Sequence, residues 1–182
     1  MAQTLYIVRH SDAAGQASNA PLTPAGIARA ERLADFLAPA GIGRIVSSPY
    51  RRALDSIAPL AARLGITVAT DKRLVERVLS TSALPDWREC LRATFTDPDL
   101  HYPGGESSRE ATARGMAAVH DALAGSPAVV AAMTHGNLAT LLLHDFDPHF
   151  GFVEWSAMTN PDVYRVTITP NGARVERTWR DE

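Results

Sequence analysis

Three short apolar runs in this chain each lead to basic residues, and this recurrence constrains the fold more than any other feature. The runs have no helical spacing and are typical of strands that are buried on both faces. The runs and the residues directly after them are 5–8 with Arg9-His10, 44–46 with 47–52, and 128–133 with 134–137. Parallel strands bring their carboxyl ends to one edge of a sheet, where α/β proteins bind ligands. The sequence therefore predicts a basic site at that edge.

Helix and turn signals around these runs predict an α/β sandwich. Thr23 is predicted to be the N-cap of a helix, with Pro24 as its first helical residue. Ser48-Pro49 has the same form at the start of the next helix. Pro59 within that second helix predicts a kink or a break. Asn171-Gly172, between two alternating runs, indicates a hairpin. We predict a three-layer α/β/α fold with a mainly parallel central sheet, helices on both faces and an antiparallel C-terminal hairpin at one edge.

The chain is expected to form one domain over residues 1–182. This length is enough to bury a substantial core, and no repeat, linker or low-complexity segment interrupts it. The periodic pattern weakens over residues 71–105, which we interpret as an insertion or cap that lies over the active-site edge. Within the insertion, residues 85–96 are predicted to form a helix.

Composition argues against several classes of function. The formal net charge of −2 gives no hint of affinity for nucleic acid or for a membrane surface. No apolar run approaches the length of a membrane span, and the first residues lack the basic region of a secretory signal. The single Cys90 excludes an internal disulfide, which favours a reducing, cytoplasmic location. No pattern specifies an oligomeric state.

The basic residues at the strand ends suit a phosphate group. Two guanidinium groups hold a tetrahedral anion by paired, charge-assisted hydrogen bonds, and Arg9 and Arg52 are the candidates. Arg51 and Arg52 lie about 100° apart around a helix, so only one of them should face the site. His10, fixed at a strand end, is the better candidate nucleophile toward phosphorus. His135 is then a donor to the equatorial oxygen atoms of the transition state.

Taken in order, these motifs resemble the histidine phosphatase superfamily, the phosphoglycerate mutase-like proteins. The resemblance covers nearly the whole chain and rests on Arg9-His10, 21–26, 48–53, 74–76, 104–107 and His135-Gly136. It implies a covalent phosphohistidine on His10. It also implies a phosphate pocket formed by Arg9, Arg52, His135 and Gly136. Neither a metal nor another cofactor is implied.

The resemblance further implies that Glu76 protonates the leaving oxygen and later deprotonates the attacking water. The expected activity is that of a histidine acid-type phosphatase, which hydrolyses a small phosphorylated metabolite without a metal. Three alternatives remain open. A phosphoglycerate mutase would use the same residues but shield the phosphoryl group from water. A protein phosphohistidine phosphatase would need an open pocket and could dispense with Glu76, and a non-catalytic module would only bind phosphate.

The sequence departs from the family pattern directly after the candidate nucleophile. Ser11, Asp12 and Ala13 stand where the family usually has Gly and often Glu-Thr. Ser11 adds a side chain where the backbone usually approaches the phosphate, and Ala13 lacks a hydroxyl group. The asparagine that the mutases use on the phosphate has no clear match, and Gln16 and Asn19 are weak substitutes. These departures give the non-catalytic alternative its best support.

Glu76 has competing interpretations. Spacing alone favours a surface carboxylate that pairs with Arg73 or Arg77. Glu106, in a glycine-rich loop just before a helix, competes with Glu76 for the role of general acid.

A metal site is a separate hypothesis. It rests on four residues of the types that bind Zn or Mn, which are His144, Asp145, Asp147 and His149. These residues come after the expected end of a helix, and Pro148 breaks their spacing. A solvated loop is therefore the preferred interpretation of this segment.

Overall fold

A computed structural model of the protein describes residues 2–125 and 127–180. Within them the chain forms a six-stranded sheet of order β3-β2-β4-β1-β5-β6. The strands are β1 (Gln3–Arg9), β2 (Arg44–Ser47), β3 (Val68–Thr70), β4 (Val129–Thr134), β5 (Asp162–Thr169) and β6 (Gly172–Arg177). The first four run parallel to one another, whereas β5 and β6 form an antiparallel hairpin at one edge. The predicted mixed sheet with an edge hairpin is therefore confirmed.

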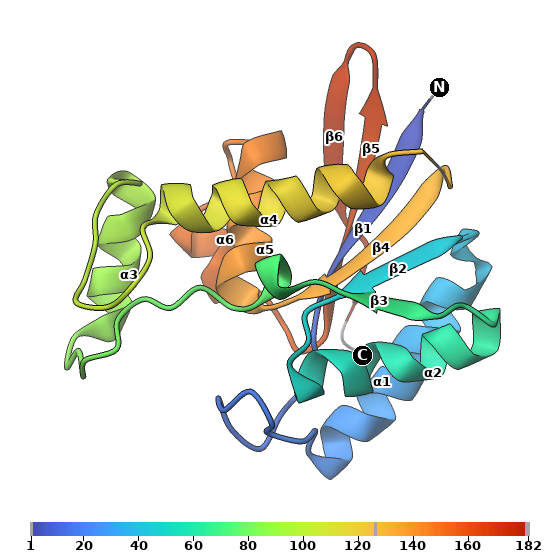
Figure 1. Ribbon diagram of the computed structural model, residues 1–182, viewed down its shortest axis with the longest axis horizontal. Helices are drawn as coiled ribbons and strands as arrows, with labels where there is room; N and C mark the ends of the chain where they lie inside the picture. The colour runs from blue at the N-terminus through green and yellow to red at the C-terminus, as the bar shows by residue number, and fades with distance from the viewer. Residues whose placement is uncertain (1, 126, 181–182) are drawn as a thin grey trace.

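Helices cover both faces of the sheet (Figure 1). On one face, α1 (Pro24–Leu37) and α2 (Arg51–Leu64) enclose a core that includes Tyr6 and Val8 of β1. On the other face, α4 (Ser108–Leu123) and α5 (Gly136–Phe146) enclose a core that includes Leu5 and Ile7. Because successive side chains of β1 point to opposite faces, one apolar strand supports both cores. This confirms the predicted three-layer sandwich.

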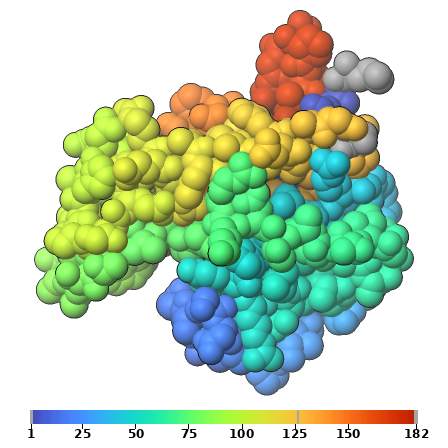
Figure 2. All heavy atoms as spheres, viewed as in Figure 1, coloured from blue at the N-terminus to red at the C-terminus, as the bar shows by residue number. Residues whose placement is uncertain are grey.

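Four further elements complete the described part of the chain. They are the 3₁₀ helices η1 (Ala38–Ala40) and η2 (Lys72–Leu74) and the helices α3 (Trp87–Thr96) and α6 (Phe152–Ser156). Helix α3 lies in the predicted insertion and contacts α6. On the face shown in Figure 2, the segment around α3 projects to one side and leaves a hollow between itself and the loop of residues 11–22.

Of the helix signals named above, Thr23 acts as an N-cap and Ser48 does not. Thr23 caps α1 by accepting a hydrogen bond from the Gly26 N–H at 3.0 Å. Ser107 and Glu110 form a capping box at the start of α4. Ser48 does not cap α2, because that helix begins at Arg51 after Tyr50. A kink or a break was predicted at Pro59, and the break does not occur, since α2 continues through this residue.

The parallel register places three strand ends side by side. Arg9 at the end of β1 is opposite Thr134 at the end of β4. On the other side of β4, Ser47 at the end of β2 is opposite Met133. The residues directly after these ends therefore meet at one edge of the sheet, as the sequence predicted. Among the described residues, no helix has the length and apolar character needed to span a membrane.

Candidate active site

His10 comes directly after β1, and its backbone is fixed on both sides. Its N–H donates to the Thr134 carbonyl at 3.2 Å, and its carbonyl accepts from Asn160 Nδ2 at 2.9 Å. The ring Nδ1 lies 2.7 Å from the Ser11 carbonyl, which can only accept, so Nδ1 carries the hydrogen of the neutral ring. Burial, aided by the positive charges of Arg52 and Arg9, lowers the pKa of His10 to about 4. At neutral pH the imidazole is therefore uncharged, with its lone pair on Nε2.

Arg52 lies in the first turn of α2 and contacts that lone pair. Its Nε donates to His10 Nε2 at 3.1 Å, and the residue is only 2% exposed. Its NH1 group donates to the carbonyls of Gln16 and Ala17, each at 3.0 Å, which fixes the guanidinium against the loop. Arg51 instead is exposed and pairs with Asp55. Only one of the two arginines faces the site, as the helical spacing predicted.

His135 comes directly after β4 and is fully buried. Its ring lies edge-on to that of His10, with the two ring centroids 5.1 Å apart. Its Nε2 is 2.8 Å from the hydroxyl of Ser48, which also accepts from the N–H of Tyr50 at 3.3 Å. Burial, followed by the charges of its neighbours, lowers the pKa of His135 well below its usual value. Both histidines of the site are thus neutral at pH 7.

Arg9 reaches the site from the last position of β1. Its NH1 group donates to the Met158 carbonyl at 3.2 Å, in the loop after α6. A Cβ atom at position 136 would lie 3.1 Å from both Nε and Cζ of Arg9, so glycine at 136 lets the guanidinium pack closely against α5. Burial lowers the pKa of Arg9, although the negative charge of nearby Glu76 partly offsets this lowering. The arginine is held between two backbone segments.

Several buried polar atoms around His10 have no protein partner. Among the described residues, all such side-chain atoms except Trp179 Nε1 belong to Arg9, Ser11, His135 and Asn137. They include Nε of Arg9, Nδ1 of His135 and both polar atoms of the Asn137 amide. Buried polar groups are normally hydrogen-bonded, so this concentration of polar atoms without a protein partner, which includes the donors Arg9 Nε and Asn137 Nδ2, indicates a site for an oxygen-rich ligand. A phosphate group fits this chemistry.

Asn137 was not singled out from the sequence as a site residue. It occupies the first turn of α5, directly after His135 and Gly136. A signal was present, because Asn137 is an amide in a helix whose residues from Gly136 to Leu143 are all buried. A buried amide in such a helix needs a partner, and a ligand at the helix N-terminus would supply one.

Glu76 lies at the N-terminus of α5 and thereby joins the site. Its Oε2 accepts from the Asn137 N–H at 3.0 Å, and its Oε1 accepts from the Leu138 N–H at 2.9 Å. Oε1 also accepts from the backbone N–H of Arg77 at 2.9 Å. The surface ion pair that spacing alone favoured is not formed, because the Arg73 side chain pairs with Asp71 and Asp121.

Glu106, the competitor for the acid role, is held by another cation. Nε and NH2 of Arg114 bind its two carboxylate oxygens at 2.6 and 2.8 Å. Burial alone would raise the pKa of Glu106, but the hydrogen bonds and charge of Arg114 lower it overall. A carboxylate bound at both oxygen atoms by arginine is poorly suited to donate a proton.

The residues that depart from the family pattern take part in the loop structure. Ser11 is buried, and its N–H donates to Ser56 Oγ at 2.9 Å. The carboxylate of Asp12 pairs with Arg29. Gln16 and Asn19 are exposed, and the contact of Gln16 with the site is made by its carbonyl.

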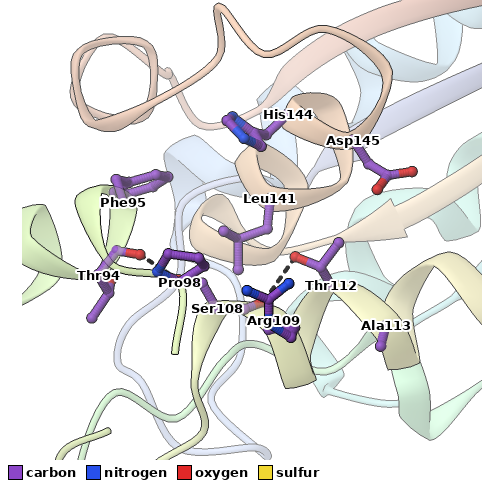
Figure 3. Close-up of a pocket in the computed structure, with 10 residues that line it drawn as sticks. All are labelled: Thr94, Phe95, Pro98, Ser108, Arg109, Thr112, Ala113, Leu141, His144 and Asp145. Carbon is purple, nitrogen blue, oxygen red and sulfur yellow. Dashed lines mark hydrogen bonds between the residues drawn. The ribbon is translucent and has the colours of Figure 1, made fainter. Parts of the chain in front are cut away.

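The residues of the metal hypothesis make other contacts. His144 Nδ1 is 2.7 Å from the Phe150 carbonyl, and His149 Nε2 is 3.5 Å from Glu154. In residues 2–125 and 127–180, no three His, Cys, Asp or Glu side chains are grouped so that they could hold a metal ion. His144 and Asp145 line a cavity of about 370 Å³ between α3, α4 and α5 (Figure 3). That cavity includes none of the residues around His10.

Comparison with curated proteins finds relatives that match over part of their length. A probable phosphoglycerate mutase of Proteus mirabilis is 32% identical over 136 residues, which are 66% of this chain and 63% of that protein. An uncharacterised protein of Mycobacterium tuberculosis is 34% identical over 79 residues, which are 40% of this chain and 39% of that protein. The matches thus span less than two thirds of these relatives.

Comparison with solved structures finds the same fold over nearly the whole chain. A mycobacterial glucosyl-3-phosphoglycerate phosphatase aligns with a TM-score of 0.79 and 23% identity and covers 100% of both chains. A phosphoglycerate mutase of Bacillus anthracis aligns with a TM-score of 0.75 and 16% identity, covering 97% of this chain and 92% of that one. At these identities the likeness establishes the fold.

The sequence model of the histidine phosphatase superfamily (branch 1) matches residues 5–181. The match contains Arg9, His10, Arg52, Glu76 and His135, which the structure brings to one edge of the sheet. The fold, the order of the motifs and this match agree, and the chain belongs to the histidine phosphatase superfamily.

Proposed function

We propose that this protein is a metal-independent phosphomonoesterase that hydrolyses a small phosphorylated metabolite through a phosphohistidine on His10. The observation that carries the proposal is the state of His10. Its Nδ1–H is bound by the Ser11 carbonyl, and its neutral Nε2 lies beside Arg52. A neutral imidazole with a fixed lone pair is a competent nucleophile toward phosphorus.

The surrounding donors suit the transition state of this reaction. Free polar atoms of Arg9, His135 and Asn137 can hold the oxygen atoms on which negative charge develops. The set already contains two guanidinium groups, so a metal would have little charge to add. In the first step, His10 Nε2 bonds to phosphorus, the P–O bond to the leaving group breaks, and Glu76 gives that oxygen its proton.

The second step regenerates the enzyme. Water attacks the phosphohistidine, Glu76 accepts the proton of that water, and phosphate leaves with the P–N bond broken. For both steps Glu76 is held in position at the N-terminus of α5. Backbone N–H groups occupy three of the roughly four acceptor positions of its carboxylate, which orients it and leaves a position for the transferred proton.

Two further expectations belong to the proposal. Residues 71–105 would cover the active-site edge and contribute to the choice of substrate. The single Cys90 supports a cytoplasmic location.

A second candidate is phosphoglycerate mutase activity, which the Proteus mirabilis relative favours. A mutase would transfer the phosphoryl group from His10 back to a hydroxyl group instead of to water. Incubation with 3-phosphoglycerate separates the two. A phosphatase releases phosphate equal to nearly all the substrate consumed, whereas a mutase forms the 2-phospho isomer with little free phosphate.

The proposal is tested with an aryl phosphate in the presence of EDTA. We expect phosphate release by the wild type, none by His10→Ala, and a loss of about 10²–10³-fold in His135→Ala, as for a lost oxyanion donor. An acid-sensitive phosphoryl label should map to the peptide that contains His10. Activity that survives in His10→Ala, or a label on the His135 peptide, would contradict the assignment. Activity that EDTA removes and Zn restores would contradict the metal-independent mechanism.

A further inference from the structure

We propose that Arg77, Glu106 and Arg114 form a clamp that holds Glu76 in its place at the N-terminus of α5. This Glu106 clamp rests on the proposed function, because it acts through the acid Glu76. Its three members are positioning residues, since their hydrogen bonds are made to the protein and not to the phosphate site.

Arg114 donates hydrogen bonds to the backbone just before Glu76. From α4 it binds the carboxylate of Glu106 with Nε and NH2. Its NH1 group donates to the carbonyls of Arg73 and Val75, at 2.6 and 3.0 Å. The side chains of Arg114 and Glu106 are only 20% and 29% exposed, so solvent competes little for these contacts. The carboxylate of Glu106 fixes the direction in which Arg114 points.

Glu106 also forms hydrogen bonds with Arg77 and Val78, the two residues directly after Glu76. Its N–H donates to the Val78 carbonyl at 2.8 Å. Its own carbonyl accepts from Nε and NH2 of Arg77, at 3.0 and 2.9 Å. The buried guanidinium of Arg77 extends this contact to α3 and α4, because NH1 donates to Thr94 Oγ1 at 2.7 Å and to Ser108 Oγ at 3.1 Å.

The backbone on either side of this contact lies very close together. A Cβ atom at Gly105 would lie 2.1 Å from the Leu79 carbonyl oxygen and 2.8 Å from that of Val78. Only glycine fits at this distance, so Glu106 is brought directly against the segment that carries Glu76. The pair Gly105-Glu106 thus supports the acid from a separate part of the chain.

The clamp is needed because Glu76 lies on irregular backbone. After η2 ends at Leu74, no helix or strand begins until α3 at Trp87. The segment therefore lacks the regular hydrogen bonds that hold His10 and His135 at strand ends. A shift of about 1 Å in a catalytic group can cost on the order of 10²-fold in rate, so even a partial loss of support should be measurable.

Glu106→Gln tests the clamp with a side chain of the same size. One amide oxygen can still accept from Arg114, but the amide NH₂ meets a second donor. Asp99→Asn is the matched control. Asp99 forms a bidentate pair with Arg109, which lies in α4 like Arg114, but both side chains of this pair are 64% exposed. Each change is made in the wild type and in Glu76→Gln. The single-turnover rate of His10 phosphorylation is then measured with an alkyl phosphate and with an aryl phosphate.

We expect Glu106→Gln to slow the alkyl phosphate roughly 10-fold in the wild type and to have little effect on the aryl phosphate, whose leaving group needs no proton. In Glu76→Gln, which has already lost the acid, it should have no further effect. Equal losses in both backgrounds would overturn the clamp, because Glu106 would then act without Glu76. Equal losses for both substrates, or no loss, would overturn it as well.

A second measurement is independent of activity. Hydrogen exchange of the Asn137 and Leu138 amides, which donate to Glu76, should be faster in Glu106→Gln and unchanged in Asp99→Asn. Unchanged exchange in Glu106→Gln would overturn the clamp. A wild type that releases no phosphate would refute the proposed function, and the exchange rates would then decide the clamp alone.

Discussion

The Nε–H of Arg52 donates to His10 Nε2 and so occupies the lone pair that the proposed reaction needs. A phosphate oxygen is a charged and therefore stronger acceptor than a neutral imidazole nitrogen. Bound substrate can thus take over this hydrogen bond and free the nucleophile. The NH1 group of Arg52 remains on the carbonyls of Gln16 and Ala17, so the exchange needs only a small movement.

Replacement of Arg52 by lysine should lower kcat/KM for an aryl phosphate by about 10²–10³-fold, as expected for a lost charge-stabilising donor. Lysine keeps the charge but lacks the planar group that binds two carbonyls and a phosphate together. Arg51→Lys is the control, because Arg51 is exposed and pairs with Asp55. Steady-state kinetics of both variants provide the test, and equal effects would contradict the selective role of Arg52.

The pH profile should report the neutral state of His10. Its pKa is lowered to about 4, so the nucleophile is neutral above that pH and becomes protonated as the pH falls through it. We expect kcat/KM, corrected for the ionisation of the substrate, to stay level from pH 7 to 5 and to fall near pH 4. An acidic limb near pH 6.5 would show that His10 behaves as a solvent-exposed histidine.

The same burial should make stability depend on pH. A histidine whose pKa is lower in the folded state binds more protons when unfolded, so the free energy of unfolding falls as the pH drops from 6.5 toward 4. Between pH 7 and 5, His10 should account for about 2 kcal/mol of this loss. Urea unfolding at both pH values, in the wild type and in His10→Asn, measures it. A variant with the same pH dependence as the wild type would contradict the prediction.

Asn137 should contribute to phosphate affinity through its free amide group. Asn137→Ala removes the donor, and Asn137→Asp replaces it with a charge that repels phosphate. We expect the inhibition constant for inorganic phosphate to rise roughly 10-fold in the first variant and further in the second. Asn171→Ala, at the exposed hairpin turn, is the control. An unchanged constant in both Asn137 variants would remove Asn137 from the site.

The strand-end pattern was sufficient to predict that His10, Arg52 and His135 would lie at one edge of the sheet. His10, Arg52 and His135 each come shortly after a parallel strand, and parallel strands must deliver their succeeding residues to one edge. Glu76 could be placed only through the family resemblance. It comes after a short 3₁₀ helix and reaches the site by binding the free N–H groups of α5, a contact that sequence spacing does not encode.

Local rules failed where a tertiary partner competed. Ser48 has the form of an N-cap, but its hydroxyl contacts His135 from the neighbouring strand end. Asn137 is among the residues that follow the third run, but no role was assigned to it from the sequence, because only its burial in α5 shows that its amide needs a partner. Pro59 was expected to kink or break α2, yet the helix continues through it and packs against α1.

The place of β1 in the sheet has a consequence for how the protein matures. Strand β1, which carries Arg9 and leads to His10, is the first strand in the sequence. Its neighbours in the sheet are β4 and β5, which come more than a hundred residues later. During synthesis, β1 leaves the ribosome long before either neighbour exists. Contacts between such distant parts of a chain form slowly, since a large loop must close first. The appearance of activity on refolding should therefore mark the completion of the sheet.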